Sequence, residues 1–180
     1  MRTVKQKSLL LNPVKQTPFN DLSQAYAYEK DHWLNVLKDW KWQAFLDNPR
    51  KIRDTFVHEK YQSRNKLQAR QWKLALDDVV DTWDGYWQSL FVQIRRKISY
   101  CKTFTSEEKH YAYWMLKGYQ QFAEMMQGIL PKSNFSINEE NKRHVVNYIQ
   151  RSLKAIKKKS PSVKRTNIVK FDSSCYSVFE

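Results

Sequence analysis

Residues 64–97, "RNKLQARQWKLALDDVVDTWDGYWQSLFVQIRRK", decide the fold, because their apolar side chains recur every three or four positions, as on one face of a helix. The stripe comprises Trp72, Leu76, Val79, Trp83, Trp87, Leu90, Ile94 and, just beyond the quoted stretch, Ile98. We predict one helix of about 35 residues with Ser63 as its N-cap. Gly85 within it costs about 1 kcal/mol relative to alanine and indicates a bend or a close backbone approach.

Four further helices are predicted around this one, from apolar periodicity and from helix start and stop signals. The predicted helices span residues 19–46, 50–61, 105–128 and 136–156. Pro49 ends the first of them. Capping boxes open the last two, with Thr105 paired to Glu108 and Ser136 paired to Glu139.

Both ends of the chain have the composition of strands. Residues 3–11 are short and partly alternating, and two β-branched or aromatic runs beyond residue 165 are separated by residues 172–174, as in a hairpin. We therefore predict a mainly α fold. About five helices form a helical bundle, which is inserted between short strands at the N- and C-termini in an α+β arrangement with an incomplete small β unit. The predicted parts are 1–12, 13–160 and 161–180, and the chain ends in strand character.

The composition is that of a folded, soluble protein. The chain has 180 residues, of which 41% are hydrophobic and 28% charged, which favours a single domain with a substantial core. Cys101 and Cys175 are the two cysteines and form no CxxC pair, which fits a reducing compartment. No secretory or membrane-length apolar stretch occurs, so we expect a cytoplasmic protein without a membrane partner.

A strong positive charge is the clearest compositional signal. Lys and Arg number 32 against 18 Asp and Glu, which gives a formal net charge of +14, with the excess leaning toward the C-terminal third. Such a field concentrates polyanions near the surface and favours nucleic acid as the partner. A charge that serves only solubility is the alternative.

Basic and amide side chains in three places are candidates for nucleic-acid contact. They are Arg64, Lys66, Arg70, Gln71, Lys73, Arg95, Arg96, Lys157, Lys158, Lys159, Lys164 and Arg165. The first five open the long helix, where an ordinary exposed face is the alternative. Arg95 and Arg96 lie near the end of that helix, where the helix dipole alone favours cations. The remaining five flank Pro161 in a linker that could bind phosphates, resemble a nuclear-localisation tract, or simply be solvated.

Catalytic and metal-binding patterns are sparse. The sequence has no GxSxG, HExxH or CxxC motif and no Gly-rich phosphate loop. Its histidines, which lie on different predicted helices, are His32, His58, His110 and His144. Asp77, Asp81 and Asp84 share a helix face that could hold Mg²⁺ for an enzymatic role, with a solvated acidic face as the alternative. We predict no catalytic residue, no metal site and no cofactor.

Three stretches in order, "SLLLNPVKQ" at residues 8–16, "LQARQWKLAL" at residues 67–76 and "NIVKFDSSCYSVFE" at residues 167–180, carry a resemblance to a known family. The chain resembles the N-terminal region of the TnpB-like RNA-guided nucleases, the OrfB-type transposon proteins related to type V CRISPR effectors. In that family a first strand ends in a step like Leu11, Pro13 and Gln16 and enters a helical recognition domain that interrupts a wedge β-barrel.

The resemblance implies that the helical insert holds the heteroduplex of guide RNA and target DNA by shape and phosphate contacts. It carries Arg64, Lys66, Arg70, Gln71 and Lys73 over as heteroduplex contacts. The family's Mg-dependent RuvC-like nuclease region belongs after the second wedge strands and is not in this sequence. We therefore expect binding without cutting, with the nuclease portion separate or missing. The alternative is a helical protein–protein interaction module with a basic surface.

Overall fold

The computed structural model describes residues 12–156, 160–162 and 169, and over these residues the chain is all α, with seven helices and no strand. The helices are α1 Pro13–Val36, α2 Trp40–Gln43, α3 Pro49–His58, α4 Ala69–Tyr100, α5 Ser106–Met115, α6 Tyr119–Met126 and α7 Glu139–Ala155. The strands predicted for residues 3–11 and beyond residue 165 lie outside the described residues, with the exception of the single residue Val169. Within the described ranges no helix is long and apolar enough to cross a membrane.

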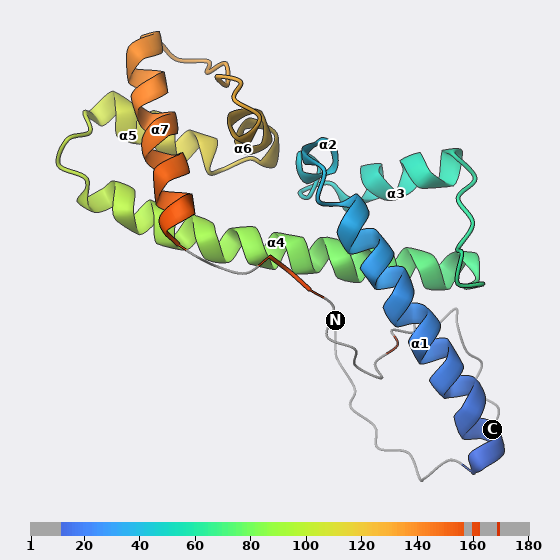
Figure 1. Ribbon diagram of the computed structural model, residues 1–180. Coiled ribbons are helices and arrows are strands. Elements are labelled where there is room, and N and C mark those ends of the chain that lie inside the picture. The colour runs from blue at the N-terminus through green and yellow to red at the C-terminus, as the bar shows by residue number, and fades with distance from the viewer. Residues whose placement is uncertain (1–11, 157–159, 163–168, 170–180) are drawn as a thin grey trace, which may run out of the picture.

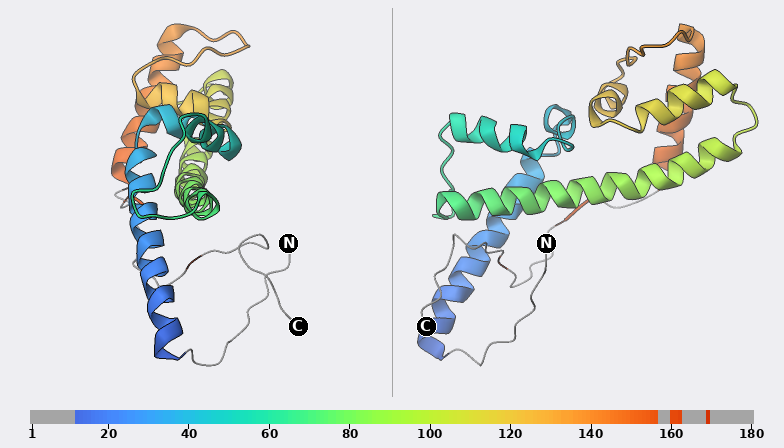
Figure 2. Two further views of the ribbon diagram at one scale, coloured as in Figure 1. Left: turned by 90° about the vertical axis from the view of Figure 1, so that its right-hand side faces the viewer. Right: turned by 180° about the vertical axis from the view of Figure 1, so that it is seen from behind.

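Helix α4 is the spine of the molecule, and the other helices form two groups along it (Figure 1). Helices α1, α2 and α3 gather over its N-terminal half, and α5, α6 and α7 over its C-terminal half. The N-terminal part of α1 extends past α4 on the opposite side, as the views in Figure 2 also show. The mainly α prediction is confirmed, but the helices form two groups on one long helix rather than a single bundle of five.

The apolar stripe of α4 is the core of both groups. All eight predicted stripe positions are buried, as are Leu74, Ala75, Val80 and Phe91. At the midpoint the ring of Trp87 lies 5.7 Å from Trp40 and 5.0 Å from Phe122, measured between centroids. Because Trp40 belongs to α2 and Phe122 to α6, this contact joins the two groups into one continuous core.

The predicted helix over residues 19–46 is two helices. Helix α1 begins at Pro13, whose missing N–H costs nothing at a first helical position, and contains Pro18 near its exposed start. Asp39 then accepts a hydrogen bond from the backbone N–H of Lys41 at 2.9 Å and caps α2. That local capping bond begins a separate helix, which the apolar spacing alone did not reveal.

Helix α4 begins later than predicted, at Ala69. Gln68 and Gln71 form its capping box. Ser63, the predicted N-cap, instead donates its hydroxyl to Glu29 at 2.6 Å. Residues 59–68 form a connecting loop in which Lys66 has a φ of 60°, so Arg64 and Lys66 are not helical as predicted.

Two further helix boundaries also differ from the prediction. The expected helix over residues 105–128 is interrupted after Met115, and Gly118 is the N-cap of α6. The capping box of Thr105 and Glu108 is confirmed. Asn138 rather than Ser136 caps α7, since its side chain accepts a hydrogen bond from the backbone N–H of Asn141 at 2.7 Å.

Gly85 is exposed in the middle of α4, and a Cβ added there would meet nothing within 4 Å. The predicted close backbone approach is therefore wrong. Because glycine costs about 1 kcal/mol relative to alanine inside a helix, we expect Gly85→Ala to raise the free energy of unfolding by about that amount. Urea unfolding measures it, and a loss of stability would contradict this account.

The buried stripe also predicts a contrast between two neighbouring positions on α4. Ile94 is fully buried, whereas Val92 is 63% exposed. We expect Ile94→Ala to lower the free energy of unfolding by about 2–5 kcal/mol. Val92→Ala should change it by less than about 0.5 kcal/mol. Equal effects in denaturant unfolding would show that this face of α4 is not the core.

Candidate nucleic-acid interface

The C-terminal half of α4 and the whole of α7 beyond its first two residues contain no acidic side chain. No Asp or Glu occurs in residues 85–106 or in residues 141–171. The described part of these stretches carries the cations Arg95, Arg96, Lys97, Lys102, Lys142, Arg143, Arg151 and Lys154. The fold brings the two stretches together, because the Tyr148 hydroxyl on α7 donates to the Lys97 carbonyl oxygen on α4 at 3.3 Å. At the start of α7 the charge of Arg143 is offset by Glu139 at 3.4 Å, so the positive charge is concentrated where Arg96 and Lys97 meet the later turns of α7.

A shallow pocket of about 470 Å³ lies where these stretches meet. Its lining residues, which we name the α4–α7 surface, are Gln93, Arg96, Lys97, Tyr100, Cys101 and Tyr148. Arg96 and Lys97 are exposed, and Tyr100 is 75% exposed. The guanidinium of Arg96 and the ammonium of Lys97 are suited to a phosphate, and the exposed ring of Tyr100 is suited to a base.

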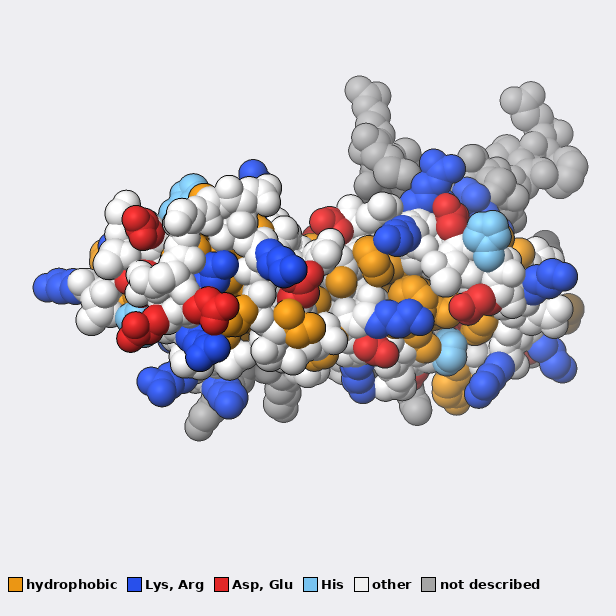
Figure 3. Space-filling view, turned by 90° about the horizontal axis from the view of Figure 1, so that it is seen from above, with side chains coloured by type: hydrophobic (Ala, Val, Ile, Leu, Met, Phe, Trp, Pro, Cys, Tyr) orange, Lys and Arg blue, Asp and Glu red, His pale blue; other side chains and the backbone are white. Residues whose placement is uncertain are grey.

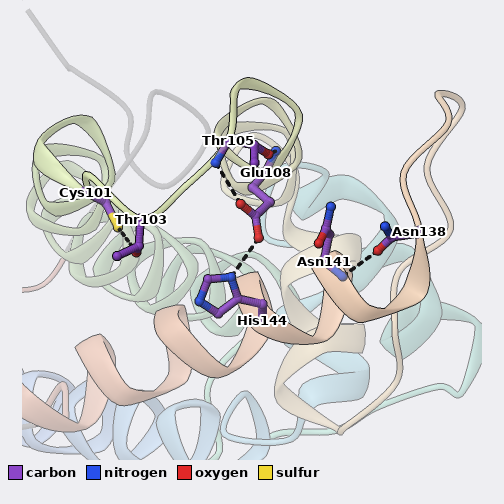
Figure 4. Close-up of polar contacts among 7 residues, drawn as sticks. All are labelled: Cys101, Thr103, Thr105, Glu108, Asn138, Asn141 and His144. Atoms are coloured by element: carbon purple, nitrogen blue, oxygen red, sulfur yellow. Dashed lines mark hydrogen bonds and ion pairs between the residues drawn. The ribbon is translucent and has the colours of Figure 1, made fainter.

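Polar contacts around Cys101 belong to this surface as well. The Cys101 Sγ lies 3.2 Å from the Thr103 hydroxyl oxygen. Burial acts to raise the pKa of the Cys101 thiol, but hydrogen bonds from Thr103, Phe104 and Tyr148 outweigh it and lower the pKa. Burial, and then the neighbouring Cys101, raise the pKa of the Tyr148 hydroxyl. Figure 4 shows Cys101 turned toward Thr103 while the imidazole of His144 is directed at Glu108.

Helix α7 is held in place by a buried carboxylate on α5. Glu108 is 3% exposed, and its Oε1 lies 2.7 Å from the Nδ1 of His144 (Figure 4). Its Oε2 accepts the backbone N–H of Thr105 at 2.7 Å. Burial acts to raise the pKa of Glu108, but these two hydrogen bonds prevail and lower it below 4.5. Glu108 thus fixes both the start of α5 and the position of α7.

The basic residues predicted at the start of α4 lie in a different setting. Arg70 and Lys73 line a pocket of about 290 Å³ together with the acids Asp54 and Asp77. Asp77 also lies 4.0 Å from the guanidinium of Arg53. Positive charge is offset there, and Figure 3 likewise shows acidic and basic side chains interspersed over the face that it views.

Two of the predicted contact residues are engaged in local structure. The Gln71 side chain accepts the backbone N–H of Gln68 at 3.0 Å in the capping box. The Lys73 ammonium lies 5.6 Å from the ring centroid of Trp72. These roles fix the start of α4 and leave less of the two side chains for a ligand.

Arg64 and Lys66 are exposed on a loop that a second buried carboxylate holds. Glu29 on α1 accepts the Tyr61 hydroxyl at 2.7 Å, the Ser63 hydroxyl at 2.6 Å and the Asn65 amide at 2.9 Å. Burial, and then this bond to Glu29, raise the pKa of Tyr61. The loop is therefore fixed, and it presents its two cations at the end of α4 opposite the α4–α7 surface.

The two arginines predicted near the end of α4 lie in different settings. The Arg95 guanidinium donates to the Leu116 carbonyl oxygen and lies 5.8 Å from the Phe91 ring centroid, so it joins α4 to the end of α5. Arg96 points to solvent on the α4–α7 surface. The linker candidates Lys157, Lys158, Lys159, Lys164 and Arg165 lie outside the described residues.

The acidic face considered for Mg²⁺ comprises Asp77, Asp81 and Asp84, and the structure engages two of these with separate partners. Asp77 lies 4.0 Å from the Arg53 guanidinium. Asp84 accepts the Tyr119 hydroxyl. Over the part of the chain that the structure describes, no group of three or more His, Cys, Asp or Glu residues could hold a metal ion.

Sequence reasoning missed Gln93, Tyr100 and Tyr148. A signal for the region was present, since the two acid-free stretches can be counted from the sequence alone. The sequence does not show that the two stretches are in contact, because Lys97 and Tyr148 are 51 residues apart.

No protein-family model, curated protein or solved structure matches the chain. The function is therefore inferred from the chemistry of the described residues.

Glu108 predicts a pH dependence of stability. Because its pKa is lower in the folded protein than its ordinary value, its stabilising effect is complete above that ordinary value and is lost as the pH falls through the folded value. We expect Glu108→Gln to lower the free energy of unfolding at neutral pH by about 1–2 kcal/mol, and the difference to shrink on acidification. Denaturant unfolding across pH 3–7 measures it. The exposed neighbour provides a control, as Glu107→Gln should keep the wild-type acid dependence.

Proposed function

We propose that this chain binds nucleic acid through phosphate contacts on the α4–α7 surface. The observation that carries the proposal is the meeting of two acid-free, basic stretches around one pocket with Arg96 and Lys97 at its edge. Arg151 and Lys154 lie exposed on the following turns of α7 and extend the same charge. Contacts of this kind hold a polyphosphate backbone without reading its sequence.

The resemblance to the TnpB-like proteins supports a narrower form of the proposal. In that form the chain is the nucleic-acid-binding portion of an RNA-guided system in the cytoplasm, and its ligands are a guide RNA and an RNA–DNA heteroduplex. It binds without cutting, and the nuclease portion is separate or missing. Arg64 and Lys66 on the fixed loop provide a second contact at the other end of α4.

Charge along α4 favours a nucleic acid that meets the end of the helix rather than its whole length. Asp77, Asp78, Asp81 and Asp84 stand between the two basic ends. Asp81 is exposed, so phosphates that followed the helix axis would be repelled there. A nucleic acid on the α4–α7 surface avoids this acidic segment.

The test is a salt series of binding affinities for an RNA–DNA hybrid, duplex DNA and single-stranded RNA. We expect Arg96→Ala/Lys97→Ala to weaken binding to all three ligands. Each phosphate contact adds about 0.9 to the slope of log affinity against log salt on duplex DNA, so that slope should fall by about 2. Fluorescence anisotropy with labelled oligonucleotides gives both quantities.

A variant with the same change in charge serves as the control. Lys38→Ala/Arg50→Ala removes two exposed cations from the α1–α3 group, where Arg50 pairs with Asp54 at 3.6 Å. We expect it to retain most of the affinity. Equal losses of affinity in both variants would show that binding depends on the net charge of the protein and not on the α4–α7 surface. Salt-insensitive, negligible binding by the wild type would favour the protein–protein interaction module instead.

A further inference from the structure

We propose that the α4–α7 pocket receives an unpaired nucleotide, so that the preferred ligand is a single strand or a single-stranded segment. This inference rests on the proposed nucleic-acid binding and names the form of the ligand at the same surface. The base stacks on Tyr100, and the adjoining phosphates lie on Arg96 and Lys97.

Tyr100 is the side chain that favours a base as ligand. It is the last residue of α4 and lies outside the buried stripe, with 75% of its surface exposed. Tyr111 and Tyr119, by contrast, are buried in the core. A broad, accessible ring beside two cations is the arrangement by which proteins hold single strands, since every base offers a face for stacking.

The rest of the pocket is firm enough to support such a ligand. The Tyr148 ring packs against Phe104 at 4.8 Å between centroids, and its hydroxyl donates to the Lys97 carbonyl oxygen. Gln93 is held by a hydrogen bond from its amide nitrogen to the Ser89 carbonyl oxygen at 3.2 Å. The bond from Tyr148 to Lys97 holds α7 against α4, while Tyr100 remains 75% exposed.

Size and shape also fit a nucleotide. A volume of about 470 Å³ falls in the usual range for small-ligand pockets, and the pocket is open to solvent. Inside a duplex each base face is covered by its neighbours, so the interior of a duplex could use Arg96 and Lys97 but not the ring of Tyr100. An unpaired nucleotide uses both parts of the surface.

The experiment compares an oligoadenylate strand, the same strand with abasic positions, and a blunt duplex, each as RNA and as DNA. We expect Tyr100→Ala to weaken binding of the intact strand about tenfold, which is typical of one lost base stack. Its affinities for the abasic strand and the duplex should match those of the wild type. The salt slope should also stay unchanged, because no cation is removed.

Two further variants separate stacking from damage to the fold. Tyr100→Trp should keep or increase the affinity for the intact strand, since indole stacks at least as well as phenol. Tyr113→Ala removes an exposed tyrosine from α5 and should leave every affinity unchanged. A difference between the RNA and DNA strands identifies the preferred sugar.

Equal binding of strand and duplex, with no effect of Tyr100→Ala, would overturn this inference. If Arg96→Ala/Lys97→Ala still weakened binding in that case, the proposed phosphate contacts would stand without the base pocket. If the wild type bound no oligonucleotide, both the inference and the proposed function would be overturned.

Discussion

Burial of the apolar stripe on α4 is the constraint on which the other elements depend. A helix of 32 residues is about 48 Å long, which is more than one short helix can cover. Two groups of helices therefore share it, and Trp87 at the midpoint serves both. The indole N–H of Trp87 donates to the side-chain oxygen of Gln43, whose amide donates in turn to the Leu37 carbonyl oxygen. These buried hydrogen bonds fix the position of the α1–α3 group at the midpoint of α4. The α5–α7 group contacts the same indole through Phe122.

Two buried carboxylates then fix the parts that the apolar core leaves undefined. A buried carboxylate is costly unless its oxygens are hydrogen-bonded, so each one tolerates few arrangements of its donors. Glu29 holds the loop before α4 through three side-chain donors, and Glu108 holds the N-terminus of α5 and the imidazole of His144. One carboxylate thus orients the loop of Arg64 and Lys66, and the other orients α7 with the wall of the α4–α7 surface.

These interactions explain which features the sequence revealed. The α4 stripe and the Thr105 capping box are local patterns, and both were predicted correctly. Ser63 looked like an N-cap, but Glu29, 34 residues away, takes its hydroxyl. Arg70 and Lys73 looked like a free basic face, but α3 brings Asp54 beside them. The pocket beside Arg96 was missed for the same reason, because Tyr148 reaches it from α7. Caps and pockets that depend on distant partners leave no periodic signal.

Charge along α4 alternates, with cations at both ends and acids between them, and the acids are largely engaged. Asp77 faces Arg53 and Asp78 faces Lys30, so these carboxylates bind α3 and α1 to the spine. Asp81 and Asp84, which follow them along α4, make the middle of the helix unfavourable for phosphates. A polyanion is left with the ends of the helix. Only at the C-terminal end does a second helix, α7, add its charge, since α7 has no acidic residue beyond Glu139 and Glu140.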